Sequence, residues 1–404
     1  MVHTWRYLRA MTTKVRLSVL QFFQNAAFAA TVITVGTYLL NNLQFSGREV
    51  GMIYATNALA ATLSPPLVGW LADRHYSADR LLVVLNLIAA AALGACFFVT
   101  SFPLFYGLIL LFNLTFIPTF ALLASVCFHQ LEEPERDFPR VRVWGTVSFM
   151  LLGVGLSYFG VEDSPWPLMI GAVMTLLFGL SCLGLPTIPS TSGFRLADLR
   201  GPEVRSIIRE PGMLVMLIAM LLICIPSAFY YSFVNPFLNE VGWENAAAKM
   251  ALGQLVEILV IVSLPFVFRH LRLRQIIFWG LFLWGARYFA FAAGRPDNAE
   301  WLLYLGILVQ GFVFAWIVIA GQIFVDNRVP ASLRSTAQGL ISFANQGPGI
   351  FLGSYLAGEV VNGYALAGGG HDWFSIWLIP GTVGVLAAIG FWWLFPRRKG
   401  LANS

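Results

Sequence analysis

Charged residues are scarce in this chain. Only 11% of its 404 residues are charged and 58% are hydrophobic, whereas soluble domains carry roughly 25% charged residues. The apolar runs at 82–99 and 373–395 also lack the polar face that a helix in water needs. This deficit excludes an ordinary soluble protein and places the chain among membrane proteins.

Cysteine and histidine are also scarce, and neither forms a chemical motif. The four cysteines lie inside apolar runs without motif spacing, and the five histidines lie outside the apolar runs or at their ends: Cys96, Cys127, Cys182, Cys224, His3, His75, His129, His270 and His371. We expect no disulfide framework, metal site or cofactor. A nucleophile elbow, a phosphate loop and a dinucleotide fingerprint are absent as well, so the sequence does not predict an enzyme.

Long hydrophobic runs are what the chain has instead. A membrane span needs roughly 20 apolar residues, and twelve runs qualify: 17–40, 50–70, 82–99, 104–128, 141–160, 166–185, 213–238, 248–268, 276–293, 301–325, 338–361 and 373–395. The basic N-terminus precedes a run of full length with no cleavage site after it. The first run is therefore predicted to be an uncleaved span rather than a signal peptide.

The basic residues predict how the spans are oriented. With the N-terminus inside, 21 of the 25 Lys and Arg residues fall in inner segments, 3 in outer segments and one, Arg287, within the ninth span. Cytoplasmic loops carry such an excess, so both termini are predicted to be cytoplasmic. The net charge of +5 is dispersed among short loops, which favours an orientation signal over nucleic-acid binding.

A polar and charged segment divides the spans six and six. We predict an N-terminal half at 1–190, a cytoplasmic linker at 191–212 and a C-terminal half at 213–404. The basic loop at 73–80, after span two, corresponds to another at 269–274, after span eight. Two six-helix halves are the architecture of transporters that alternate around a central site.

Glu257 is the acidic residue at the middle of an apolar span. Arg287 lies at a matching depth on the next, antiparallel span: each is 11 residues from the shared inner loop, or roughly 16 Å. A carboxylate at mid-membrane requires a partner, a proton or a function. Two interpretations remain open: a static ion pair between Glu257 and Arg287, or a carboxylate that titrates during transport.

Other polar side chains share helix faces with aromatic rings. Gln254 lies one turn before Glu257, on the same face. On the fifth span, Arg142, Thr146 and Phe149 form one stripe. Further pairs and clusters of this kind are Gln310 with Phe314 on span ten, Gln21, Gln24 and Asn25 on span one, and Tyr230, Tyr231 and Asn235 on span seven. Such stripes suit a polar, uncharged, flat ligand, but helix-to-helix hydrogen bonding explains them too.

Several sequence motifs resemble those of a known family. The segment Gly69-Trp-Leu-Ala-Asp73-Arg74 followed by Arg80 resembles the signature of the major facilitator superfamily, without its usual glycine after the first basic residue. Over nearly the whole chain the sequence resembles the nucleoside:H⁺ symporter family. The most specific segments are 137–146, 334–339, 358–361 and Asp372-Trp373.

The resemblance implies an all-α membrane protein of the major facilitator fold, and it implies site residues. Arg142, Thr146, Phe149, Gln254, Glu257 and Phe314 match family positions at the nucleoside site, and Asp73 and Arg74 belong to the signature, which we assign to a gating loop. The chain departs from the family at four positions. It has Ala228 and Tyr231 instead of amides, Gln310 instead of a tyrosine, and Ala315 instead of an acid.

These observations predict a secondary transporter of the bacterial inner membrane that imports nucleosides with protons by alternating access. Tyr231 and Gln310 join the predicted substrate site, and proton coupling is assigned to Glu257 with Arg287. The partners are a nucleoside, protons and the lipid bilayer, and we expect a monomer that binds no nucleic acid. The open alternatives are the same fold carrying a sugar or a nucleobase, and a receptor or scaffold without transport.

Overall fold

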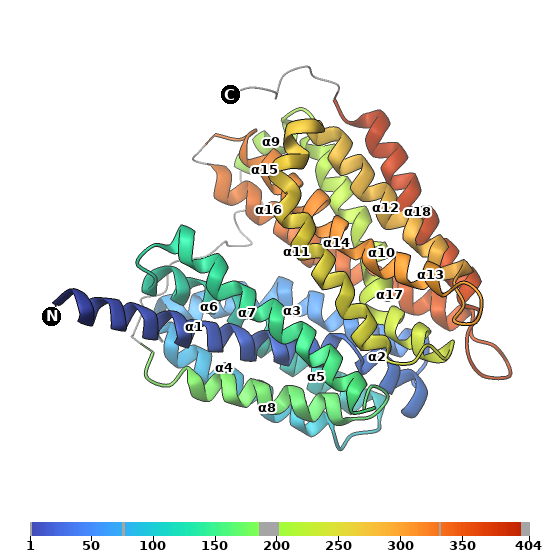
Figure 1. Ribbon diagram of the computed structural model, residues 1–404, viewed down its shortest axis with the longest axis horizontal. Helices are drawn as coiled ribbons and strands as arrows, with labels where there is room; N and C mark the ends of the chain where they lie inside the picture. The colour runs from blue at the N-terminus through green and yellow to red at the C-terminus, as the bar shows by residue number, and fades with distance from the viewer. Residues whose placement is uncertain (1, 75–76, 186–201, 331–332, 397–404) are drawn as a thin grey trace. The chain divides into compact units, whose positions relative to one another are not determined.

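The described part of the chain is helical. The computed structural model describes residues 2–74, 77–185, 202–330 and 333–396 (Figure 1), and among them one isolated antiparallel bridge joins Ala365 and His371. The all-α fold predicted from the sequence is confirmed. It follows from long apolar runs whose backbone hydrogen bonds can be made only within the helix when water is absent.

Nine helical stretches of the described residues are long and apolar enough to cross a membrane. They correspond to nine of the twelve predicted spans. The other three predicted spans are also helical. The second is α3 (Gly47–Arg74), some of whose side chains lie outside the described part of the structure, and the sixth is the shorter α8 (Trp166–Ser181). The eleventh span is divided into two helices.

The chain divides into two compact units: Met1–Phe45 with Leu59–Gly193, and Ser46–Ala58 with Phe194–Ser404. Apart from α3, the helices of unit 1 are α1 (Val2–Val32), α2 (Val35–Thr37), η1 (Tyr38–Asn42), α4 (Ala78–Cys96), α5 (Phe102–Phe116), α6 (Pro118–Gln130), α7 (Pro134–Tyr158) and α8. Those of unit 2 are α9 (Pro202–Arg209), α10 (Met213–Glu240), α11 (Ala246–His270), α12 (Leu273–Ala293), α13 (Glu300–Leu308), α14 (Gln310–Val313), η3 (Phe314–Ile319), α15 (Ala320–Asp326), α16 (Arg334–Gln346), α17 (Pro348–Gly363) and α18 (Trp373–Leu394). Residues 191–201 of the predicted linker lie outside the described residues, and α9 occupies most of the remainder.

The two units repeat one pattern of helix pairing. In unit 1 the main pairs are α1 with α7 and α4 with α8, which are spans one with five and three with six. In unit 2 they are α10 with α17 and α12 with α18, which are spans seven with eleven and nine with twelve. Each pair in unit 2 is the unit 1 pair advanced by six spans, as an internal repeat requires.

Glycines explain why the first part of α3 groups with unit 2. A Cβ atom on Gly51 would lie 2.5 Å from the carbonyl oxygen of Ser354, and one on Gly358 would lie 2.7 Å from that of Gly47. The backbones of α3 and α17 therefore touch, as small residues allow in membrane helices. An ion pair of 2.6 Å between Arg48 and Glu359 lies beside this crossing.

Proline and π-helix interrupt several predicted spans. The fourth span changes from α5 to α6 at Pro118, and the eleventh changes from α16 to α17 at Gly347 and Pro348. The tenth contains the π-helical segment η3, a feature common near functional sites. By contrast, Pro226 and Pro236 lie within the continuous α10.

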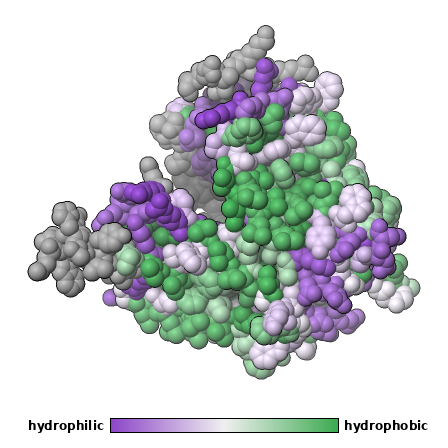
Figure 2. Space-filling view, in the orientation of Figure 1, coloured by the Kyte–Doolittle hydropathy of each residue, from purple (hydrophilic) through white to green (hydrophobic). Residues whose placement is uncertain are grey.

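Large apolar side chains cover the helix faces that point outward. On α11, Leu259, Val262 and Phe266 are each at least 65% exposed. Figure 2 shows this hydrophobic surface on unit 2, over the region where α11 lies in Figure 1. Such a face is unfavourable in water and suited to lipid, which agrees with the membrane location predicted from the composition.

Candidate functional site

A first polar cluster, the Arg142 centre, joins α1 to α7 in unit 1 and consists of Gln21, Asn25 and Arg142. Arg142 Nη1 donates a hydrogen bond of 3.3 Å to Asn25 Oδ1. Asn25 Nδ2 donates to the Gln21 carbonyl oxygen at 2.9 Å. Gln21 and Asn25 are buried while Arg142 is exposed. The Asn25 amide thus holds one side of the guanidinium, and its exposed part can meet a ligand.

Gly145 makes room for this contact. A Cβ atom at Gly145 would lie 2.5 Å from Arg142 Nη1 and 2.6 Å from Asn25 Nδ2. Any larger residue would push the guanidinium and the amide aside. The glycine one turn after the arginine is therefore a local condition for the geometry of the Arg142 centre.

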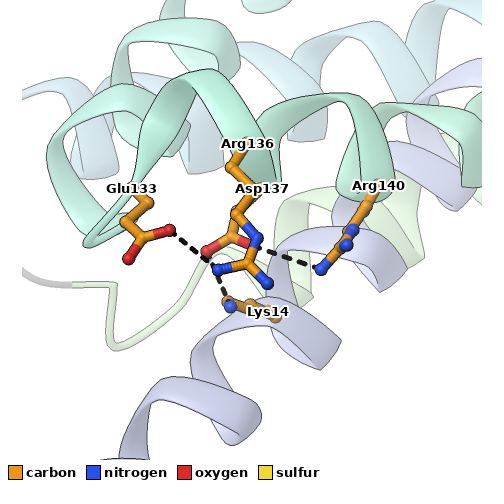
Figure 3. A network of polar contacts seen from close by, with 5 residues as sticks. All are labelled: Lys14, Glu133, Arg136, Asp137 and Arg140. Atoms are coloured by element: carbon orange, nitrogen blue, oxygen red, sulfur yellow. Dashed lines mark hydrogen bonds and ion pairs between the residues drawn. The ribbon is translucent and has the colours of Figure 1, made fainter.

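An ion-pair network fixes the start of α7 to α1 (Figure 3). Asp137 is buried, and its carboxylate lies 2.6 Å from Lys14 Nζ on α1 and 3.9 Å from Arg140 Nη1. Glu133 and Arg136 form a neighbouring pair of 3.1 Å that is exposed on both sides. Asp137 lies five residues before Arg142, so this anchor holds the part of α7 that leads to the arginine.

Thr146 and Phe149 continue the Arg142 face along α7. Both are half-buried. The stripe predicted from their spacing thus carries a guanidinium, a hydroxyl and an aromatic ring on one helix of unit 1. These groups can donate hydrogen bonds to a polar ligand and stack on a flat one.

A second cluster, the Arg287 centre, lies in unit 2 and consists of Tyr230, Tyr231, Trp284, Arg287 and Gln310. Arg287 is 2% exposed, and its guanidinium carbon lies 3.7 Å from the ring centroid of Trp284 and 3.9 Å from that of Tyr230. Arginine stacked on aromatic faces gains cation–π energy that increases as water is excluded. The cage offsets part of the large penalty of a cation inside a membrane span.

The hydrogen bonds of Arg287 lead outward from this cage. Arg287 Nη1 donates to Gln310 Oε1 at 2.8 Å, and Gln310 Nε2 donates to the Tyr231 hydroxyl oxygen at 3.4 Å. Gln310 is buried, whereas Tyr231 is 45% exposed. The buried cation is therefore connected through one amide to an accessible phenol.

Two glycines bring α11 against this cluster. A Cβ atom on Gly253 would lie 3.2 Å from Gln310 Cβ, and one on Gly311 would lie 2.5 Å from the backbone nitrogen of Glu257. Gln254 and Glu257 are half-buried on this part of α11. Glu257 lies within electrostatic reach of Tyr231, so the mid-span carboxylate belongs to the same neighbourhood.

The structure therefore brings together Tyr231, Gln310 and Glu257, which the sequence placed on three separate spans. Arg287 is in the same neighbourhood, but its hydrogen bonds go to Gln310 and, at 3.5 Å, to the Tyr288 hydroxyl. A direct pair between Arg287 and Glu257 stays a prediction. Sequence reasoning assigned no role to Trp284, although its position one turn before Arg287 was a readable signal.

Three predicted site residues have side chains outside the described part of the structure. The backbone of Phe314 begins η3, and those of Asp73 and Arg74 end α3. Their predicted roles therefore stay predictions. Within the described residues, no three His, Cys, Asp or Glu side chains are grouped as a metal site would require, and the four cysteines are buried and unbridged.

This fold and these polar clusters define a multi-pass membrane transporter rather than an enzyme. The family profile described as Nucleoside H+ symporter matches residues 11–399. The chain therefore belongs to the nucleoside H⁺ symporter family, as its motifs predicted.

Several known proteins are similar along nearly their whole length. The chain is 33% identical to YegT of Escherichia coli (strain K12), covering 94% of this chain and 93% of YegT. It is 29% identical to the xanthosine permease of that organism, covering 95% and 96% of the two chains. A crystal structure of a mutant of the nucleoside transporter NupG matches with a TM-score of 0.89 at 28% identity, covering 95% of this chain and all of that one. The predicted major facilitator fold is thus confirmed.

Proposed function

We propose that this protein imports nucleosides together with protons across the bacterial inner membrane by alternating access. The observation that carries the proposal is Glu257: a half-buried, mid-span carboxylate near Tyr231 in a chain of the nucleoside H⁺ symporter family. Relatives named as nucleoside and xanthosine permeases support the substrate class.

Side chains in and beside each centre offer groups that suit a nucleoside. Arg142, Thr146 and Gln254 offer donors and acceptors for ribose hydroxyls and base edges. Phe149 and Tyr231 offer rings on which a base can stack. In the same proposal Phe314 supplies a further ring, and Asp73 and Arg74 serve the gating loop.

Glu257 carries the coupling proton in this scheme. A carboxylate can bind and release a proton, which a coupling group must do. By the resemblance described above, Ala315 stands where the family pattern has another acid, so coupling depends more heavily on Glu257 in this proposal. Arg287 acts on it as a neighbouring positive charge rather than through a required direct bond.

The variant Glu257→Gln tests the coupling role in proteoliposomes with an imposed pH gradient. We expect labelled uridine to equilibrate without accumulating, because glutamine cannot exchange a proton. The control Glu133→Gln changes an exposed carboxylate immediately before α7 and should accumulate uridine as wild type does. Full accumulation by Glu257→Gln would contradict the assignment.

One alternative substrate class has support of its own. Tyr231 and Gln310 replace an amide and a tyrosine of the family pattern and are in contact here, so the base-facing groups differ from that pattern. A thermal-shift screen of nucleosides, nucleobases and sugars separates these solutes, since a ligand that binds only the folded protein raises its Tm. Counterflow of labelled solute distinguishes transport from a receptor without turnover.

The topology completes the proposal. The excess of basic residues in the predicted inner segments supports an orientation with both termini in the cytoplasm. We expect a monomer, because two six-helix halves of one chain are a known transporter architecture. Labelling of single cysteines placed near either terminus, with a reagent that does not cross the membrane, checks the orientation: no labelling in intact cells is expected.

A further inference from the structure

We infer that Arg287 and Gln310 fix the Tyr231 hydroxyl as a hydrogen-bond donor toward the ligand. The protein would then favour nucleosides whose base presents a carbonyl oxygen over those that present an amino group. The inference rests on the proposed nucleoside transport and specifies which bases are preferred.

The first step is the direction of the bond from Arg287. A guanidinium has donors and no acceptor. Its 2.8 Å contact with Gln310 must therefore be made by the amide oxygen. The cage of Trp284 and Tyr230 holds the guanidinium in place, so the orientation of the Gln310 amide is fixed as well.

The second step follows from that orientation. With its oxygen bound to Arg287, the Gln310 amide turns its NH₂ group to the Tyr231 hydroxyl oxygen, 3.4 Å away. Tyr231 is thereby an acceptor toward the protein and keeps its own O–H for another partner. Within the described residues no hydrogen bond takes that proton, and the Tyr231 side chain is 45% exposed.

The third step concerns the ligand group that this hydroxyl selects. Ribose hydroxyls both donate and accept, so they do not distinguish the direction of a bond. Base edges do: uridine and inosine have a carbonyl oxygen where cytidine and adenosine have an amino group. A fixed donor at Tyr231 pairs with the carbonyl and leaves the amino group without an acceptor, which is unfavourable in a desolvated site.

The variant Gln310→Glu should reverse the selection with almost no change of shape. A carboxylate accepts from Arg287 and also from Tyr231. The tyrosine would then donate to the protein and offer its oxygen to the ligand. The affinity should therefore rise for nucleosides with an amino group and fall for those with a carbonyl oxygen at that position. Tyr231→Phe removes the hydroxyl and should bring the two classes toward equal affinity.

The experiment compares affinities for uridine with cytidine and for inosine with adenosine, measured by competition against one labelled nucleoside on purified protein. We expect wild type to prefer the carbonyl member by roughly tenfold, and Gln310→Glu to invert the preference. The control Gln322→Glu adds the same charge to the same span, roughly 18 Å further along, and should keep the wild-type ratio.

The outcomes separate this inference from the function on which it rests. Nucleoside binding with the same ratio in wild type, Gln310→Glu and Tyr231→Phe would overturn the donor assignment and leave the proposed transport intact. If folded wild type binds none of the four nucleosides, both proposals are wrong. A ratio that moves in Gln310→Glu and in Gln322→Glu alike would indicate a general charge effect and would also overturn the assignment.

Discussion

Arg142 and Arg287 are each bonded to a side-chain amide, yet their surroundings are opposite. Arg142 is exposed on α7 and lies 3.3 Å from Asn25 Oδ1. Arg287 is 2% exposed, lies 2.8 Å from Gln310 Oε1 and is stacked on Trp284. An exposed guanidinium can donate to a ligand, whereas a buried one acts through the groups that it holds and through its charge. This difference supports a proposed binding role for Arg142 and a proposed positioning role for Arg287.

The largest expected difference is between alanine variants of the two arginines. Arg287→Ala should lower the free energy of unfolding by roughly 3–5 kcal/mol, because it leaves a cavity among packed rings. Arg142→Ala should change stability by less than about 1 kcal/mol, as exposed sites do, while weakening nucleoside binding at least tenfold. Thermal unfolding and ligand binding of both purified variants check this. Equal losses of stability in the two variants would contradict the proposed difference between the two arginines.

A middle-sized effect is expected at the anchor of the Arg142 centre. Asp137→Asn removes the buried charge that pairs with Lys14 at 2.6 Å, and hydrogen bonds to charged groups contribute about 1.5–3 kcal/mol. The matched change Glu133→Gln breaks the exposed pair with Arg136 and should cost less than about 1 kcal/mol. Thermal unfolding at low and high salt measures both. A smaller loss for Asp137→Asn than for Glu133→Gln would show that α7 is anchored elsewhere.

The smallest effect is expected at Gly145. Gly145→Ala puts a methyl group 2.5 Å from Arg142 Nη1, so the guanidinium must move and affinity should fall by a few-fold. Gly155 lies on the same helix with nothing within 4 Å of its position for a Cβ atom. Gly155→Ala should leave binding unchanged and gain up to about 1 kcal/mol of helix stability. Identical affinities in the two variants would mean that the contact of Arg142 with Asn25 does not matter for binding.

The spans could be predicted from the sequence because a membrane imposes one simple rule on length and hydropathy. The predicted run at 276–293 agrees with α12, and that at 213–238 with α10. Length and hydropathy do not reveal where a helix is interrupted inside a run. The run at 338–361 is interrupted at Gly347, because the residue before Pro348 avoids the helical conformation.

The candidate site could be predicted only in part. Periodicity placed Gln254 with Glu257 on one face and recorded the amides of span one, and depth matching brought Arg287 near Glu257. Neither the periodicity nor the depth of the spans predicted that Gln310 binds Arg287 or that Asn25 binds Arg142, because these contacts depend on how neighbouring helices are rotated and how closely they pack. Gly145 leaves room for the side chains of Arg142 and Asn25, and Gly311 faces the backbone of α11. Such contacts cannot be identified from spacing along one helix.

The most direct test of the central claim is proton movement that accompanies nucleoside uptake. Wild-type protein in proteoliposomes, with no gradient imposed, should take up protons when uridine or inosine is added outside. The external pH, followed in a weakly buffered medium, should then rise in proportion to the uptake, and Glu257→Gln should give no such rise. Nucleoside uptake by wild type with no change in external pH would contradict proton coupling through Glu257.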